Sequence, residues 1–254
     1  MRKKTKKTVG ATPTSIPESP QGNFLFMTGA ICALAFLIRI VFVRIQADIL
    51  NPDEIFQTVE QAHRMVFGYG FIPWEFQYGV RSPILPFFLS VVMRIGQYLL
   101  PAPGYIWATQ VFLSLASIAV VFVACRWGVE TGGLRGGTFA GLFTACSSDL
   151  IHMAGRALSE VFAANLLCVA LLLVCTGKPR TFRRYFLVGI LFGSCIVFRL
   201  QLAPAVGVVF LWTCRTQWHE RWLPMTCGAA MAILLGSGAV DWFVYGSPFH
   251  SSYT

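Results

Sequence analysis

Long apolar segments make up most of the chain, and short polar loops separate them. Apolar runs of this kind are typical of membrane-crossing helices, and the short intervals between them leave no room for a soluble domain. The pattern predicts an all-α membrane protein, a multi-pass helical bundle. Arg39 and Arg44 are expected to snorkel near the far end of the first span. The seven expected spans are residues 24–47, 105–125, 134–151, 159–176, 185–200, 202–214 and 222–240.

One further apolar segment, residues 83–99, is expected to lie along the outer membrane surface. It is short, begins with prolines and is interrupted by Arg94, which is typical of interfacial or re-entrant segments. If it crossed the membrane, the basic stretches 178–184 and 215–221 would face away from the cytosol, against the positive-inside rule. We therefore expect residues 48–104 to form the first luminal loop.

The composition agrees with a membrane protein. Of 254 residues, 56% are hydrophobic and 12% are charged, and the mean hydropathy is +0.63, values typical of multi-pass proteins. Much of the net charge of +9 lies in residues 2–7 and two basic loops. A basic tail beside a span more often sets topology than binds nucleic acid, so no nucleic-acid partner is expected. We expect residues 1–22 to be a disordered cytosolic tail and residues 23–254 a transmembrane domain.

Neither the cysteines nor the histidines form a ligand pattern. Most of the eight cysteines fall in or beside apolar runs without CxxC spacing, so we interpret them as small buried side chains. The four histidines share no ligand spacing. We therefore predict no metal site and no cofactor; a divalent metal is compatible with the sequence but has no support in it.

Residues 51–83 form the longest polar stretch between apolar segments. Asn51 can cap a helix, Pro52 suits its first position, and Glu54 completes a capping box. The glycines of FGYG end this helix. The sequence predicts a helix at the membrane surface, followed by a polar loop.

Wound at 3.6 residues per turn, this helix has a polar face and an apolar face. We expect the polar face to point away from the lipid. Its members are Asp53, Gln57, Glu60 and Arg64, and the apolar face carries Phe56, Val59, His63 and Phe67. This number of charged and polar side chains favours a functional site over a simple connecting loop.

Asp53 is the candidate general base. A carboxylate held at a membrane surface can take the proton of a sugar hydroxyl, which an inverting transfer requires. The helix dipole also favours acids at this position, and capping alone would account for Glu54. Asp53 shares its predicted face with Gln57 and Glu60, and this clustering of polar side chains favours a catalytic role for Asp53.

Ionisable residues at the ends of later spans are further candidates. Arg156 and Glu160 have the i,i+4 spacing of a helical ion pair, but charges at the junction of two spans are often functional. Arg199, beside Gln201, either binds a lipid phosphate or snorkels as an anchor. Trp74 belongs either to an interfacial aromatic belt or to the wall of a sugar site.

The predicted topology has a chemical consequence. It brings four polar clusters, distant in sequence, to the same outer face. These clusters are residues 53–81, 156–160, 199–201 and 241–245.

Several short sequences resemble the dolichyl-phosphate-mannose-dependent alpha-mannosyltransferases (glycosyltransferase family 22), above all the branch that builds glycosylphosphatidylinositol (GPI) anchors. The first luminal loop of that family is matched by PDE at 52–54, EQAH at 60–63, FGYG at 67–70, WE at 74–75 and RSP at 81–83. RALSE at 156–160 and FRLQ at 198–201 are similar to its later luminal motifs.

The resemblance implies a GT-C fold with juxtamembrane helices in the first luminal loop. It also implies an inverting transfer of mannose from a dolichyl- or polyprenyl-phosphate-mannose donor to a glycolipid or lipid-linked glycan. Asp53 takes the base position, and Arg199, with Arg81, would neutralise the departing phosphate. The membrane would be the endoplasmic reticulum in a eukaryote, or the inner membrane with a periplasmic site in a bacterium. The other residues expected to bind donor or acceptor are Glu54, Gln57, Glu60, Trp74, Glu75, Arg156, Glu160 and Gln201.

Two positions depart from the family pattern. Asn51 stands where the family usually has His, and Ser159 stands where it usually has Asn. Family members are also much longer, so we expect the chain to be an N-terminal fragment. Two alternatives stay open: a non-catalytic truncated relative that binds polyprenyl phosphate, and a lipid or solute transporter, although transporters tend to show internal repeats and mid-membrane charges.

Overall fold

The computed structural model describes residues 21–46, 51–176, 181–217 and 220–249, and within them every regular element is helical. The prediction of an all-α membrane protein is confirmed. Most of the predicted tail, residues 1–20, lies outside the described residues. The elements are α1 (Gln21–Ile45), α2 (Pro52–Glu54), the π-helix η1 (Ile55–Val59), α3 (Glu60–Phe67), α4 (Trp74–Gln77), α5 (Ile84–Leu99), α6 (Gly104–Cys146), α7 (Ser148–Ala154), α8 (Ser159–Cys175), α9 (Phe182–Phe198), the 3-10 turn η2 (Leu200–Leu202), α10 (Ala203–Gln217) and α11 (Leu223–Tyr245).

Helix α6 is a helical hairpin. Its 43 residues are interrupted at two adjacent glycines, of which Gly133 has a φ of 63°, a conformation that favours glycine. A Cβ placed at Gly136 would lie 2.5 Å from the carbonyl oxygen of Gly128. Residues so far apart in a straight helix are separated by about 12 Å, so the chain reverses here. The reversal lies between the predicted spans 105–125 and 134–151, and the second of these is divided between α6 and α7.

By length and composition, three helices of the described residues are suited to cross a membrane, namely α1, α6 and α11. Helices α7 and α8 meet at a bend of 115° and make a fourth if the pair counts as one span. Helices α9 and α10 have 17 and 15 residues, fewer than the roughly 20 that a span usually needs. The predicted number of seven spans exceeds these three or four and stays a prediction.

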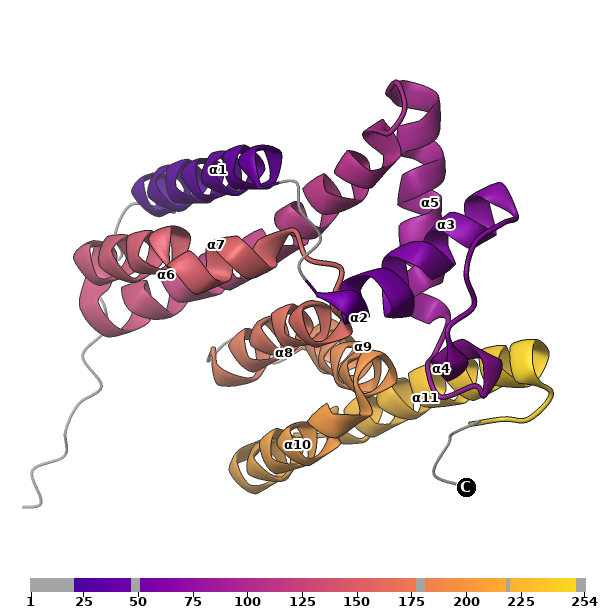
Figure 1. Cartoon of the computed structure of the whole chain (residues 1–254). Helices are drawn as coiled ribbons and strands as arrows, with labels where there is room; N and C mark the ends of the chain where they lie inside the picture. Colours follow the sequence, from indigo (N-terminus) through magenta and orange to yellow (C-terminus); the bar gives the residue numbers. More distant parts are fainter. Residues whose placement is uncertain (1–20, 47–50, 177–180, 218–219, 250–254) are drawn as a thin grey trace, which may run out of the picture.

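The helices form two groups, with the polar loop between them (Figure 1). Helix α1 lies along α6 and α7, whereas α8, α9, α10 and α11 form the second group. Helices α9 and α11 approach closely at Gly189. A Cβ there would lie only 2.4 Å from the carbonyl oxygen of Thr226. Of the loop helices, α2 lies between the two groups, α3 packs on α5, and α4 lies in front of α11 in this view.

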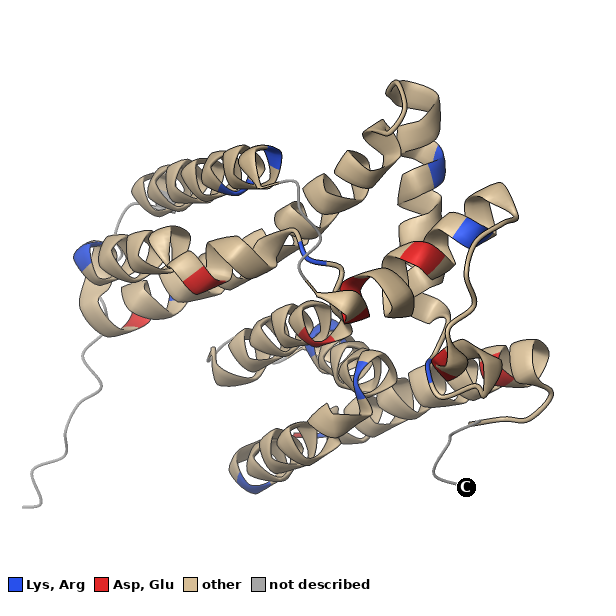
Figure 2. Ribbon diagram, viewed as in Figure 1, with Lys and Arg blue, Asp and Glu red and all other residues tan. Residues whose placement is uncertain are grey.

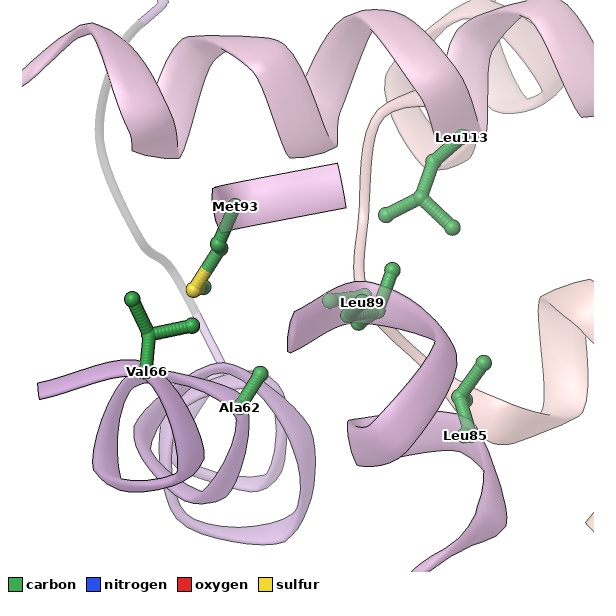
Figure 3. Packing of buried hydrophobic residues seen from close by; sticks show 7 residues of the cluster. Ala62, Val66, Leu85, Leu89, Met93 and Leu113 are labelled. Atoms are coloured by element: carbon green, nitrogen blue, oxygen red, sulfur yellow. The ribbon is translucent and has the colours of Figure 1, made fainter. Parts of the chain in front are cut away.

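Helix α5, the segment expected to lie along the outer membrane surface, packs the polar loop against α6. Its buried Leu85, Leu89 and Met93 face Ala62 and Val66 of α3 (Figure 3). Burial of each such large side chain contributes roughly 1.5–3 kcal/mol, so this cluster fixes the loop on the bundle. The other face of α5 exposes Phe87, Phe88, Val91 and Ile95. That this face meets the membrane surface stays a prediction.

The expectation that Arg39 snorkels is wrong. Arg39 is 1% exposed, and its Nη1 donates to the carbonyl oxygen of Ala35 at 3.1 Å. Ala35, Arg39 and Val43 are all buried at four-residue intervals, so they share the face of α1 that packs on the neighbouring helices. Arg44 lies off this face and is exposed.

Candidate active site

The helix at the start of the polar loop begins where predicted. The side chain of Asn51 accepts a hydrogen bond from the backbone N–H of Asp53 at 3.0 Å, and Pro52 occupies the first helical position. The predicted faces are wrong, because η1 is wound as a π-helix. A π-turn holds more residues than an α-turn, so it rotates every later side chain relative to a 3.6-residue pattern.

The rotation changes the surroundings of both predicted faces. Gln57 is buried, Glu60 and Arg64 are half-buried, and Asp53 alone of the predicted polar face is exposed. On the predicted lipid-facing side, Phe56 is exposed, but His63 packs within the protein, in contact with Phe67, Tyr69 and Tyr105.

Glu54 does not complete the capping box. Glu54 is 2% exposed and its carboxylate turns inward. There, Oε2 lies 3.4 Å from Nη1 of Arg156, and Oε1 accepts the backbone N–H of Ala157 at 3.3 Å. Thr58 donates to the carbonyl oxygen of Ala157 as well. Burial raises the pKa of Glu54 above its ordinary value, and the contacts to Ala157 and Arg156 offset part of that rise. Glu54 therefore anchors the loop to the segment before α8.

Arg156 and Glu160 do not form the helical i,i+4 pair that is one of the two interpretations of their spacing. Helix α8 begins only at Ser159, so the two residues do not share a helix. Glu160 instead pairs with Arg199, whose Nη2 lies 2.6 Å from Oε1 of Glu160. Nη1 of Arg199 is buried and has no hydrogen-bond partner within the described part of the chain. Gln201 is exposed in η2.

Polar contacts link η1, α4, the segment before α5 and the end of α11. Nε2 of Gln57 donates to Oε1 of Glu75 at 2.8 Å, and Nε of Arg81 lies 3.9 Å from the same oxygen. The hydroxyl group of Tyr245, at the end of α11, donates to the carbonyl oxygen of Arg81 at 3.0 Å. Charged residues accordingly gather where the loop helices meet α8, α9 and α11 (Figure 2).

Two cavities lie on either side of the bond between Gln57 and Glu75. The loop cavity has a volume of about 390 Å³ and is lined by Asp53, Phe56, Phe71, Pro73, Trp74, Glu75 and Gln77. The inner cavity, of about 30 Å³, has room for roughly one water molecule. Its lining residues are Gln57, Thr58, Arg81, Ser82, Leu85, Pro86, Ser159, Val197 and Phe198.

Glu60 supports the wall of the loop cavity, and its expected contact with substrate stays a prediction. Its Oε1 accepts the backbone N–H of Phe71 at 2.7 Å, and Nε2 of Gln61 donates to the carbonyl oxygen of Phe71 at 3.2 Å. Phe71 is therefore held at both backbone groups. Trp74, which lines the same cavity, is 60% exposed.

The contacts confirm that the four predicted polar clusters meet. Glu54 reaches the 156–160 segment, Glu160 reaches Arg199, and Tyr245 reaches Arg81. Sequence reasoning missed Thr58, Phe71 and Gln77 as parts of the site, because no local signal distinguishes them from ordinary loop residues. Ser82 enters that reasoning only as a member of the RSP motif at 81–83. Within the described residues, no three His, Cys, Asp or Glu side chains gather as a metal site would require. The absence of a metal or cofactor stays a prediction.

Comparison with known proteins identifies the family of the chain. The family model of the Alg9-like mannosyltransferases matches residues 30–253. Similar curated proteins include Mannosyltransferase APTG1 of Arabidopsis thaliana, 37% identical over 79 residues. GPI mannosyltransferase 3 of Trypanosoma brucei brucei is 38% identical over 72 residues, and that of Drosophila melanogaster is 32% identical over 72 residues.

The aligned segments cover 28% to 31% of this chain and 11% to 13% of these relatives. No solved structure matches the chain. The family match, in contrast, extends over most of the described helices, from α1 to the end of α11. The chain therefore belongs to the Alg9-like mannosyltransferase family.

Proposed function

We propose that the chain transfers mannose from a dolichyl- or polyprenyl-phosphate-mannose donor to a glycolipid or lipid-linked glycan acceptor. Family membership supports mannose as the transferred sugar. The relatives named GPI mannosyltransferase 3 support a glycolipid acceptor, and their eukaryotic sources support the endoplasmic reticulum as the membrane, with the site on its luminal face.

The observation that carries the proposal is the arrangement of a carboxylate and a cation in adjacent cavities. Asp53 is exposed at the start of the loop helix and lines the loop cavity with Glu75. Arg81, 3.9 Å from Glu75, lines the inner cavity. A site for glycosyl transfer needs a base toward the acceptor and a positive charge toward the departing phosphate.

In the proposed step, an acceptor hydroxyl oxygen attacks C1 of the donor mannose. Asp53 takes the hydroxyl proton as the new C–O bond forms. The bond between C1 and the phosphate oxygen breaks, and its electron pair leaves with the polyprenyl phosphate. Attack from the face opposite the leaving group inverts the configuration at C1. The acidic group that results, protonated Asp53, returns its proton to solvent at the exposed end of the helix.

Two arginines are suited to the departing phosphate. Arg199 has a buried Nη1 without a hydrogen-bond partner among the described residues, while its Nη2 is fixed by Glu160. Arg81 lines the inner cavity, and Tyr245 fixes its backbone. A guanidinium group keeps its charge and donates paired hydrogen bonds to phosphate oxygens. Negative charge that develops on the phosphate would therefore be stabilised from this side.

The proposal is tested by mannose transfer from a short-chain polyprenyl-phosphate-mannose to lipids extracted from membranes. The chain and its Asp53→Asn variant are compared at equal amounts in the same membranes. We expect transfer by the first and none by the second. Transfer by the variant at a near wild-type rate would refute the assignment of Asp53 as the base.

A further inference from the structure

The loop cavity has two chemically different sides. Phe56, Phe71 and Trp74 supply exposed aromatic surface, while Asp53, Glu75 and Gln77 supply polar groups. Its volume of about 390 Å³ falls in the range of roughly 300–1,000 Å³ found for small-molecule sites. A ligand that fits must therefore present an apolar face and a set of hydroxyl groups.

The aromatic side is fixed before any ligand arrives. Phe56 and Phe71 meet edge to face, with ring centroids 5.7 Å apart. The backbone of Phe71 is held by Glu60 and Gln61. Gly70, beside Phe71, has a φ of 140°, and a Cβ there would lie 2.4 Å from Oε1 of Glu60. This wall is therefore built from specific contacts and is not a chance cluster of exposed rings.

The polar side is also held in place. Oε1 of Glu75 accepts a hydrogen bond from the buried Gln57, and Nε2 of Gln77 donates to the carbonyl oxygen of Ile72 at 2.8 Å. Asp53 projects from the first turn of the helix. Two carboxylates in one cavity are suited to accept hydrogen bonds from neighbouring hydroxyl groups.

We propose that the loop cavity binds the terminal pyranose residue of the acceptor glycan. The C–H face of the sugar ring lies on Trp74 and Phe71, which shield it from water. Glu75 accepts a hydrogen bond from a hydroxyl group that does not react, and Asp53 accepts one from the hydroxyl that does. The inference rests on the proposed transferase function and adds to it the place and the chemistry of acceptor recognition.

Binding can be measured without turnover. The full chain in phosphatidylcholine nanodiscs is mixed with methyl α-mannopyranoside, and saturation-transfer difference NMR reports contact between protein and sugar. We expect a signal with the wild-type chain and about tenfold weaker binding with Trp74→Ala, the loss expected for one aromatic contact. Trp74→Phe should restore most of the binding. Trp242→Ala, which removes another exposed tryptophan outside this cavity, should change nothing.

The Asp53→Asn variant separates this inference from the proposed function. It should bind the mannoside within about twofold of wild type, because an amide still accepts a hydrogen bond, and yet transfer no mannose. If wild type gives no signal, or Trp74→Ala binds as well as wild type, the loop cavity is not the sugar site. If Asp53→Asn still transfers mannose, the assigned base fails while the binding result stands.

Discussion

Arg156 lies 3.4 Å from the carboxylate of Glu54, a residue 102 positions away in sequence. This contact joins the first turn of the loop helix to the segment that precedes α8. Both side chains are almost completely buried. A buried charged pair thus holds two segments of the candidate site together. Neither residue of the pair lines the loop cavity or the inner cavity.

Arg156→Gln should destabilise the protein by at most roughly 3–5 kcal/mol, the loss typical when one partner of a buried ion pair is removed. Protonation of Glu54, which its burial already favours, limits the loss. The double variant with Glu54→Gln should regain most of that loss. Thermal unfolding in detergent gives both values. The matched control is Arg126→Gln, since Arg126 pairs with Glu130 at 3.2 Å on a more exposed surface, where such pairs contribute about 1 kcal/mol or less. Equal losses at the two positions would contradict the assigned role.

The burial of Glu54 makes a prediction about pH. Its pKa is raised above the ordinary value of 4.5, so the fold favours the protonated form. The resulting stability is fully present below pH 4.5 and is lost as the pH rises through the folded-state pKa. The free energy of unfolding of wild type, relative to Glu54→Gln, should therefore fall between acidic and neutral pH. A difference that grew with pH would mean that the ionised form is favoured.

Local signals in the sequence predict much of the fold. The start of the loop helix follows from a cap and a proline, and the reversal in α6 follows from adjacent glycines. Each of these features depends on residues close together in the chain. Hydrophobic patterning likewise identifies the apolar helices.

The internal arrangement of the site could not be predicted in the same way. The π-turn at Ile55–Val59 buries Gln57, and the partners of Glu54 and Glu160 come from distant segments. Phe71 joins a cavity wall because Glu60 holds its backbone. These contacts are set by packing between elements, which a single sequence does not record.

Gly70→Ala should weaken acceptor use. The new Cβ would lie 2.4 Å from Oε1 of Glu60, and the backbone at φ 140° disfavours any side chain. The loop must shift and carry Phe71 away from the cavity. Initial rates at varied acceptor concentration should show a higher KM for the acceptor and an unchanged KM for the donor. Gly228→Ala is the control, because a Cβ at Gly228 has no neighbouring atom within 4 Å. An unchanged acceptor KM in Gly70→Ala would argue against a role for the Phe71 wall in acceptor binding.

Arg199→Gln should slow transfer by about 100-fold or more, as the loss of a group that stabilises developing charge commonly does. Arg199→Lys should recover part of the rate, because it restores the charge without the paired donors. Arg135→Gln, at an exposed position beside the turn of α6, serves as the control. Wild-type rates in Arg199→Gln would remove this arginine from the donor site.

The most direct test of the central claim compares two exposed aspartates, each in the first turn of a helix. Asp53 lines the loop cavity, whereas Asp149, in the first turn of α7, lines neither cavity of the candidate site. Mannose transfer is measured for Asp53→Asn and Asp149→Asn in the same membranes, after equal insertion is verified. Loss of transfer in Asp53→Asn alone is the predicted result. Near wild-type transfer in Asp53→Asn, or equal loss in both variants, would contradict a catalytic role for Asp53.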